Sequence, residues 1–267
     1  MAATDTYGLY NTNMDTAVDS HGCNIKRTGS SGSYTYRVPW EWSHRPVNYV
    51  SWGDAARFAN WLHNGQPTGN QVLATTEDGA YYLNGATTDA QLLAVSRESD
   101  WKWAITSEDE WYKAAYYKGG STHAGYWDYP TKSDTAPSNV GWDGYTDPGN
   151  HANFWDNGSP TIGSPYYRTN VGEFENSAST YGTFDQGGNM YEWNESKFYG
   201  VSGWCGGLRG GNFTSANVDL RASSRNGAIL DGGGPYWGFR VSEVPEPATM
   251  SLLALGGLGM LVRRRRK

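Results

Sequence analysis

The sequence is poor in charged and in aliphatic side chains, and both shortages exclude classes of protein. Only 18% of the 267 residues are Asp, Glu, Lys or Arg, and Leu and Ile are scarce before the C-terminal segment. A helical bundle is not expected, because each of its helices needs a regular aliphatic stripe. The formal net charge is −6. The dense basic cluster at 263–267 directly follows an apolar run and is confined to the C-terminal end. Nucleic acid is not an expected partner, since it needs a basic surface.

Cysteine and histidine are also few. Cys23 and Cys205 are far apart and lack the short spacing of a metal or redox motif. They could form one disulfide in an exported protein, and the sequence leaves this open. The five histidines stand singly and are expected to be surface or packed residues, not metal ligands. Residues 1–5 have neither a basic start nor an apolar stretch, so no secretory signal is expected there.

Aromatic residues and glycine are abundant instead. Aromatics make up 15% of the chain, and there are 35 glycines, which favours a loop-rich protein with a core of large flat side chains. The segment 181–193 holds three glycines and two carboxylates, and it is expected to be a glycine-shaped loop that runs into a short aromatic strand. Asp185 and Glu192 then lie among free backbone carbonyls, the oxygen mixture that calcium prefers. A turn in which Asp185 bonds its own backbone remains the alternative.

Two helices are predicted from the residue patterns at their N-termini. Ser51 with Asp54, and Ser107 with Glu110, have the spacing of capping boxes, in which side chains satisfy the free amides of the first turn. Glu108 and Glu110 could be read as a catalytic pair, but side chains two apart on a helix do not face each other, which favours capping. Short strands are expected at 33–38, 208–213, 220–222 and 236–241, with a hairpin near 80–83.

The C-terminal segment has three parts in order: Pro245, Glu246 and Pro247, then the uncharged run 250–262, then the basic end. Thirteen residues at about 1.5 Å each are too short for a permanent membrane span. The order resembles a PEP-CTERM sorting signal. This resemblance implies export, processing at 245–247 by exosortase-type sorting machinery and transient inner-membrane anchoring through 250–262. The implied destination is the cell surface or the extracellular matrix.

The body of the chain resembles the formylglycine-generating enzymes, also called sulfatase-modifying factors. The motifs that carry the resemblance occur in the family's order, at 46–55, 105–111, 188–193, 209–213 and 238–240. The implied fold is α+β and C-type-lectin-like, in the variant of this family, with low regular secondary structure, two helices and small antiparallel sheets. The expected division is a partial N-terminal part of the domain at 1–45, the main domain at 46–243 and the sorting segment at 244–267.

The resemblance also implies site residues. The family's calcium site falls on the side chains of Asp185 and Glu192 and on the carbonyls of Gly188 and Met190. A second calcium site would begin at Asn153 and Phe154, although its acidic partner is replaced near Ser164.

The family's copper site is the main departure. Ser215 stands where the first of two copper-binding cysteines would be, and the segment that holds the second is shortened. Copper is not expected, because thiolates select Cu(I) and a hydroxyl does not.

Three hypotheses about function follow from this departure. The first is an exported protein that recognises a glycan or a surface protein through its C-terminal loops, whose polar and aromatic side chains suit adaptable contacts. The second is a formylglycine-generating-type oxidoreductase, or another enzyme of the superfamily, with an unidentified site. A purely structural matrix component is a third reading. The residues proposed for the recognition surface are Asn217, Asp219, Arg221, Arg225, Tyr236 and Trp237.

Overall fold

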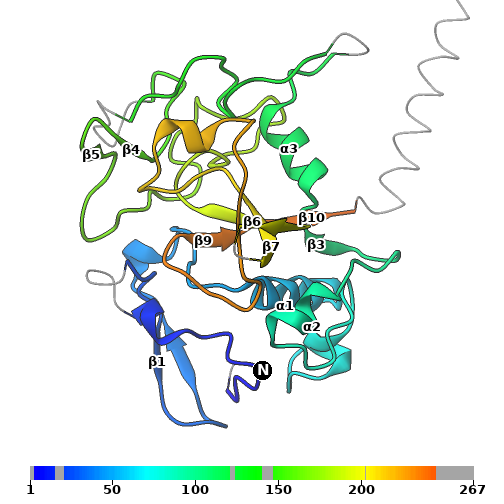
Figure 1. Cartoon of the computed structure of the whole chain (residues 1–267). Helices are drawn as coiled ribbons and strands as arrows, with labels where there is room; N and C mark the ends of the chain where they lie inside the picture. Colours follow the sequence, from blue (N-terminus) through cyan, green and yellow to red (C-terminus); the bar gives the residue numbers. More distant parts are fainter. Residues whose placement is uncertain (1–2, 16–20, 121–123, 140–146, 202, 245–267) are drawn as a thin grey trace, which may run out of the picture.

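The molecule is organised around a sheet whose strands follow the order β8–β7–β6–β9. The computed structural model describes residues 3–15, 21–120, 124–139, 147–201 and 203–244. In Figure 1 the sheet crosses the middle of the molecule, with helix α1 on one side and helix α3 on the other. β6 pairs antiparallel with β7 and parallel with β9. The bounds of these elements are α1 Trp52–His63, α3 Glu108–Tyr116, β6 Tyr191–Gly200, β7 Gly203–Arg209, β8 Asn226–Ala228 and β9 Trp237–Phe239.

Smaller elements complete the fold, and irregular loops join them. β1 pairs with β2, β3 with β10 and β4 with β5, each antiparallel. Their bounds are β1 Lys26–Thr28, β2 Thr35–Arg37, β3 Trp103–Ile105, β10 Val241–Glu243, β4 Trp155–Asp156 and β5 Ser159–Pro160. The short helical turns are Thr12–Asp15, Trp40–Trp42, Leu73–Glu77, α2 Asp89–Leu93 and Asn217–Leu220. The expected α+β fold with low regular secondary structure is confirmed.

Both predicted helices begin with the expected capping boxes. In α1 the Ser51 hydroxyl accepts from the amide of Asp54, and the Asp54 carboxylate accepts from the amide of Ser51. Ser107 and Glu110 make the same exchange at α3. These reciprocal bonds satisfy amides that have no partner within the helix, which is why both helices start where the sequence predicts. The five-residue α2 was not predicted, since so short a helix has no periodic apolar face.

The main core lies between α1 and the sheet and depends on large aromatic side chains. Trp52 and Trp193 are fully buried there. The indole N–H of Trp52 donates to the Asn194 carbonyl at 3.2 Å, and that of Trp193 donates to the Val50 carbonyl at 2.9 Å. Buried indoles need such partners, so each Trp both fills volume and ties two segments together.

Two local predictions were wrong. No hairpin forms near 80–83; Tyr81 instead makes a single bridge with Arg97. Residues 220–222 do not form a strand, because Leu220 ends a 3-10 turn and is buried against Tyr129 and Phe154. Both segments are only three or four residues long, and so short a segment does not distinguish a strand from a packed turn.

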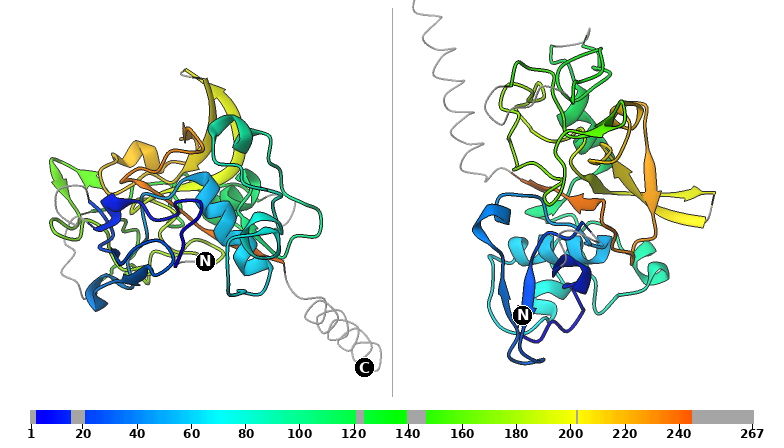
Figure 2. Two further views of the ribbon diagram at one scale, coloured as in Figure 1. Left: turned by 90° about the horizontal axis from the view of Figure 1, so that it is seen from below. Right: turned by 90° about the vertical axis from the view of Figure 1, so that its left-hand side faces the viewer.

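The β6–β7 hairpin extends beyond the body of the molecule (Figure 2). Its register shifts between Trp193 and Lys197, where the strand passes from the core to the outer arm. On that arm the rings of Tyr199 and Trp204 meet edge to face at 5.9 Å, and both are exposed. The predicted aromatic strand after residue 190 is therefore confirmed, and it is longer than expected.

Candidate functional site

The glycine-rich loop before β6 brings together residues from both predicted calcium sites. Gly188 has a φ of +75°, and its N–H donates to the Gly210 carbonyl at 2.8 Å. The Asn189 N–H donates to the Asn153 carbonyl at 2.7 Å, so Asn153 and Gly188 form a parallel bridge. A Cβ on Gly188 would lie 2.2 Å from the Asn153 carbonyl oxygen. Glycine is required here because two backbone segments approach too closely for any side chain.

Asp185 and Glu192 differ in how far the protein already neutralises them. Burial raises the pKa of Asp185 to about 6, while the amide of Gly172, which donates to Oδ2 at 2.7 Å, and the charge of Arg240 oppose that rise. Both oxygens of Glu192 accept from the Arg240 guanidinium, and Oε2 also accepts from the Trp111 indole at 2.6 Å. Glu192 therefore has a full counter-ion, whereas Asp185 does not have a salt bridge within the described residues.

The oxygens around this loop suit calcium in type. Within the described residues, Asp185 Oδ1 accepts no hydrogen bond, and Asn153 Oδ1 is buried without a partner. Hard oxygen ligands of this kind are what calcium binds. At the second predicted site the Phe154 carbonyl already accepts from Thr161 and Asn139. In the described part of the chain no group of three or more His, Cys, Asp or Glu side chains could by itself hold a metal ion, so an ion at this loop would need amide and carbonyl oxygens beside the carboxylate of Asp185.

Ser215 closes a tight turn after β7. Its hydroxyl accepts from the Asn212 N–H at 3.1 Å, and its own N–H donates to the Asn212 carbonyl at 3.0 Å. The side chain is buried. Cys205 lies on β7, where its thiol donates to the Gly203 carbonyl at 3.5 Å, and Cys23 is buried in the main core. Both thiols are free, so the disulfide that the sequence left open does not form in this structure.

The six residues proposed for a recognition surface have different surroundings. Arg221 Nε donates to the Tyr129 hydroxyl at 2.8 Å, and the Arg225 guanidinium lies 4.3 Å from the ring of Phe198. Trp237 packs edge to face against Trp193 at 5.5 Å and is partly buried against the core. Asn217 and Asp219 lie in the 3-10 turn, and the Tyr236 ring lies 5.6 Å from the ring of Phe213.

Tyr236 belongs to a group of rings that the sequence did not indicate. We call His21, Tyr167, Phe213 and Tyr236 the aromatic cluster. The His21 ring lies 4.5 Å from that of Tyr167 and 5.4 Å from that of Phe213. The Phe213 side chain is buried, and the other three side chains are half-buried. His21 and Tyr167 both have positive φ, at 56° and 57°, a strained conformation for bulky residues that is often found at functional sites.

A buried arginine lies next to the aromatic cluster, with its guanidinium carbon 5.9 Å from the centroid of the Phe213 ring. Arg168 is fully buried and donates to the carbonyls of His21 at 2.6 Å and Gly22 at 2.8 Å. Its Nε has no hydrogen-bond partner, and no carboxylate pairs with it among the described residues. Burial lowers its pKa to about 10, since desolvation disfavours the charged form. The cluster is therefore a platform of rings with a positive charge next to it.

The carboxylates Glu108 and Glu110 have separate partners. Glu108 accepts from Arg209 Nε at 2.6 Å and from Asn194 at 2.7 Å. Glu110 caps α3 and pairs with both terminal nitrogens of Arg97 at 2.9 Å. The predicted capping role is confirmed for Glu110, whereas Glu108 binds Arg209 and Asn194 instead.

The sparse helices, small sheets and glycine-rich loops define an α+β domain that solved structures share. CarF resembles the chain with a TM-score of 0.51 and 18% identity, over 91% of this chain and 82% of CarF. Variable protein 1 of Treponema denticola gives a TM-score of 0.50 and 18% identity, over 91% of this chain and 82% of that protein. At this identity the likeness shows the fold alone. A comparison with curated proteins gives no match.

The chain belongs to the sulfatase-modifying factor enzyme 1-like domain family, whose model matches residues 5–244. The PEP-CTERM protein-sorting motif matches residues 243–267. This motif implies export, recognition by exosortase-type sorting machinery and a surface or extracellular location. The predicted processing site Pro245, Glu246 and Pro247 and the run 250–262 lie outside the described residues. Within the described part, none of the helices has the length and apolar character needed to cross a bilayer.

Proposed function

We propose that this protein is an exported recognition module that retains the sulfatase-modifying-factor scaffold without its copper–cysteine oxidase chemistry. The observation that carries the proposal is the turn at Ser215. A buried hydroxyl that accepts from the Asn212 N–H stands where the first sulfur ligand would be. Hydroxyl oxygen is a poor ligand for Cu(I), whereas thiolates select it. Cys23 and Cys205 lie in the core and on β7, away from this turn in the sequence.

The aromatic cluster is the proposed recognition surface. Half-exposed rings of His21, Tyr167 and Tyr236 offer a rigid apolar platform on which a sugar ring or another flat group can stack. The positive charge of Arg168 next to them favours a ligand with acidic groups. An acidic glycan is therefore the ligand class that the cluster fits best, with a surface protein as the other candidate.

Calcium is the proposed structural ion of the glycine-rich loop. Asp185 would supply a carboxylate oxygen, and Gly188 and Met190 would supply their carbonyls. Glu192 would supply a second carboxylate oxygen only by exchanging one of its hydrogen bonds from Arg240 or Trp111 for the ion. Asp185 supports this role because its buried charge lacks a cationic partner among the described residues. When bound, calcium would supply that missing positive charge and fix the loop between β6 and the Asn153 segment.

The C-terminal segment is proposed to be cleaved and not kept. Pro245, Glu246 and Pro247 would be the processing site, and 250–262 would anchor the chain in the inner membrane only until that step. The released domain would then reach the cell surface or the extracellular matrix.

Metal content and ligand binding test the proposal together. Purified protein should contain calcium but less than 0.1 equivalent of copper or iron, and it should not consume oxygen with a thiol peptide. On an array of acidic and neutral bacterial polysaccharides, the wild type should bind acidic members. Tyr236→Ala should reduce that binding about tenfold, a loss of about 1.4 kcal/mol, because it removes one ring of the platform. Trp204→Ala removes an exposed ring on the β7 arm and is the matched control.

Two results would contradict the proposal. Stoichiometric redox metal together with thiol-dependent oxygen uptake would support the alternative, a formylglycine-generating-type oxidoreductase with an unidentified site. Equal polysaccharide binding by wild type and Tyr236→Ala would exclude the aromatic cluster as the recognition surface.

A further inference from the structure

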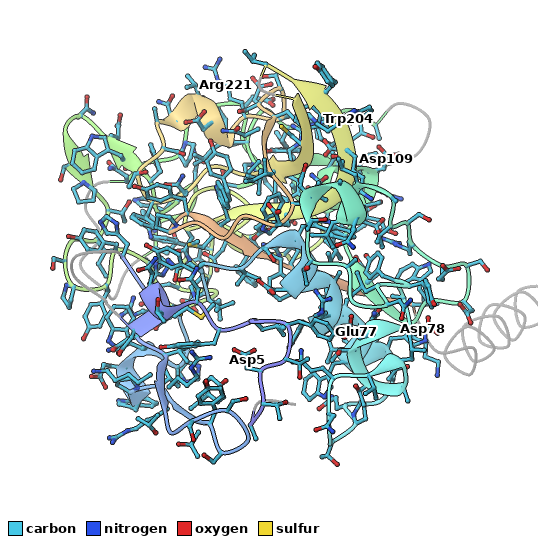
Figure 3. All side chains as sticks on the ribbon, turned by 60° about the horizontal axis from the view of Figure 1, so that its bottom comes forward. Asp5, Glu77, Asp78, Asp109, Trp204 and Arg221 are labelled. Carbon is cyan, nitrogen blue, oxygen red and sulfur yellow. The ribbon has the colours of Figure 1, made fainter. Side chains whose placement is uncertain are left out.

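A cavity of about 670 Å³ lies between the N-terminal segment and α1, and its wall includes no residue of the aromatic cluster or of the proposed calcium site. Its wall is mostly apolar and aromatic, and it includes Tyr10, Tyr36, Val47, Phe58, Trp61 and Phe239. A concave, apolar space of this size with few polar groups is typical of small-molecule sites. In Figure 3, Asp5 on this wall lies well away from Arg221 of the C-terminal loops.

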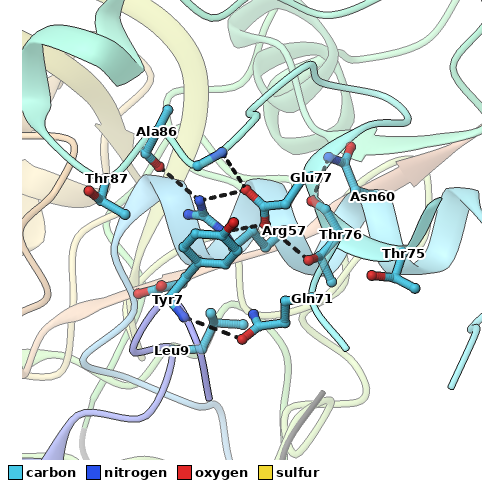
Figure 4. A network of polar contacts seen from close by, with 12 residues as sticks. Tyr7, Leu9, Arg57, Asn60, Gln71, Thr75, Thr76, Glu77, Ala86 and Thr87 are labelled. Atoms are coloured by element: carbon cyan, nitrogen blue, oxygen red, sulfur yellow. Dashed lines mark hydrogen bonds and ion pairs between the residues drawn. The ribbon is translucent and has the colours of Figure 1, made fainter. Parts of the chain in front are cut away.

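The charged residues on the wall do not balance. Asp5 pairs with Arg27 at 2.9 Å, and Arg57 pairs with Glu77 at 2.8 Å. Figure 4 shows that both oxygens of Glu77 are occupied by Arg57 and its neighbours. Asp54 lines the same cavity, and within the described residues no salt bridge joins it to a cation. Among the described wall residues, Asp54 is therefore the charged side chain without a salt-bridge partner.

Asp54 also keeps one oxygen free. Its Oδ2 accepts from the amide of Ser51 at 2.9 Å and from the Ser51 hydroxyl at 2.7 Å, which fixes the capping box of α1. No described residue donates a hydrogen bond to Oδ1. Burial raises the pKa of this carboxyl to about 6, an effect that the Ser51 hydrogen bonds and the charge of Arg57 oppose only in part. A desolvated carboxylate of this kind gains strongly from a cation that reaches it.

We propose that this cavity binds an organic monocation, an ammonium group with an apolar substituent. The ammonium group would donate to Asp54 Oδ1, and the substituent would lie among the rings of Tyr10, Phe58 and Trp61. Aromatic faces attract cations, and apolar walls favour the substituent over free solution. A carboxylate ligand would meet the charge of Asp54 and be repelled. A neutral ligand would fill the cavity but leave that charge unpaired.

Three probes that share a phenyl-alkyl group but differ in charge separate the contribution of charge to binding from that of apolar contact. Binding of 4-phenylbutylammonium, 4-phenylbutanol and 4-phenylbutyrate to the full chain is measured by titration calorimetry at pH 7.5. The ammonium probe should bind about tenfold or more tightly than the alcohol, because only the ammonium group forms an ion pair with the desolvated Asp54 carboxylate. The carboxylate probe should bind most weakly. Equal affinities for the three, or no binding at millimolar concentration, overturn the proposal.

Matched substitutions locate the site. Asp54→Asn keeps an oxygen to accept from Ser51 and removes the charge, so the ammonium probe should fall to the affinity of the alcohol. Asp109→Asn removes the same charge from an exposed position in α3 and should change nothing. Phe58→Leu keeps the wall apolar but removes a ring, and it should weaken the ammonium probe more than the alcohol. Unchanged ammonium binding by a folded Asp54→Asn, judged by its thermal melt, refutes the assignment.

Discussion

Gly188→Ala should destabilise the protein far more than Gly182→Ala, although both glycines have nearly the same backbone conformation. Their φ angles are +75° and +76°. Forcing alanine into this left-handed region costs about 1–2 kcal/mol at either position. A Cβ at Gly182 meets nothing within 4 Å, so that cost is the whole expected effect there. Gly182→Ala is therefore the matched control for the conformational term.

At Gly188 a steric term is added. The new Cβ would lie 2.2 Å from the Asn153 carbonyl oxygen and 2.8 Å from its carbon, so the two backbone segments must move apart. The hydrogen bonds from Asn189 to Asn153 and from Gly188 to Gly210 are then weakened, at about 1 kcal/mol each, and overpacking adds about 1–3 kcal/mol. We expect a total loss of about 4–7 kcal/mol.

Urea unfolding followed by tryptophan fluorescence measures both variants, with the slope of the transition checked against the wild type. The expected result is a loss for Gly188→Ala that exceeds the loss for Gly182→Ala by about 3 kcal/mol or more, the sum of the two hydrogen-bond terms and the smallest overpacking term. A difference below about 1 kcal/mol would refute the close approach of the Asn153 and Gly188 segments, because overpacking alone costs at least that much.

Three other predictions follow from buried charges. Glu77→Gln should lower the free energy of unfolding by about 3–5 kcal/mol in urea titrations, because it leaves Arg57 buried with no counter-ion; a loss below 1 kcal/mol contradicts this. Asp54→Asn should raise stability at pH 8 by about 1–3 kcal/mol but not at pH 4. The folded pKa of Asp54, about 6, exceeds the unfolded value. The stabilisation that the protonated Asp54 carboxyl provides is therefore full below pH 4 and is lost as the pH rises through 6. Equal changes in stability at the two pH values, measured by thermal melts, would contradict this prediction. Calcium at about 100 times its Kd should stabilise the wild type by about 2.7 kcal/mol in differential scanning calorimetry, and Asp185→Asn should abolish the gain; an equal gain in the variant excludes Asp185 as a ligand.

The sequence predicted those parts of the fold that depend on neighbouring residues. The capping boxes at Ser51 and Ser107 need only residues three apart, and both form as expected. The glycine-rich loop before β6 was predicted from its composition. Gly182 and Gly188 both have positive φ, a conformation that favours glycine, so the glycine content reflects the shape of the backbone.

The contacts that make the candidate site could not be predicted in this way. The bridge between Asn153 and Gly188 joins segments more than 30 residues apart and has no periodic pattern. The aromatic cluster brings His21 next to Tyr167 and Phe213 from distant loops. Isolated aromatic residues in loops look alike in a sequence, whether they pack in the core or share one surface. Only Tyr236 of the cluster was among the predicted ligand residues.

The way the Ser215 turn is held explains how the scaffold can persist without a metal-binding thiol there. The turn is closed by two hydrogen bonds between Ser215 and Asn212, and the Ser215 carbonyl also accepts from the Trp155 N–H at 2.9 Å. None of these bonds needs a sulfur atom or a metal. The side chain at this position can therefore lose its metal chemistry while the loop keeps its shape. Because the loop geometry and the redox chemistry depend on different atoms, a surface built on this loop is compatible with recognition in the absence of oxidation.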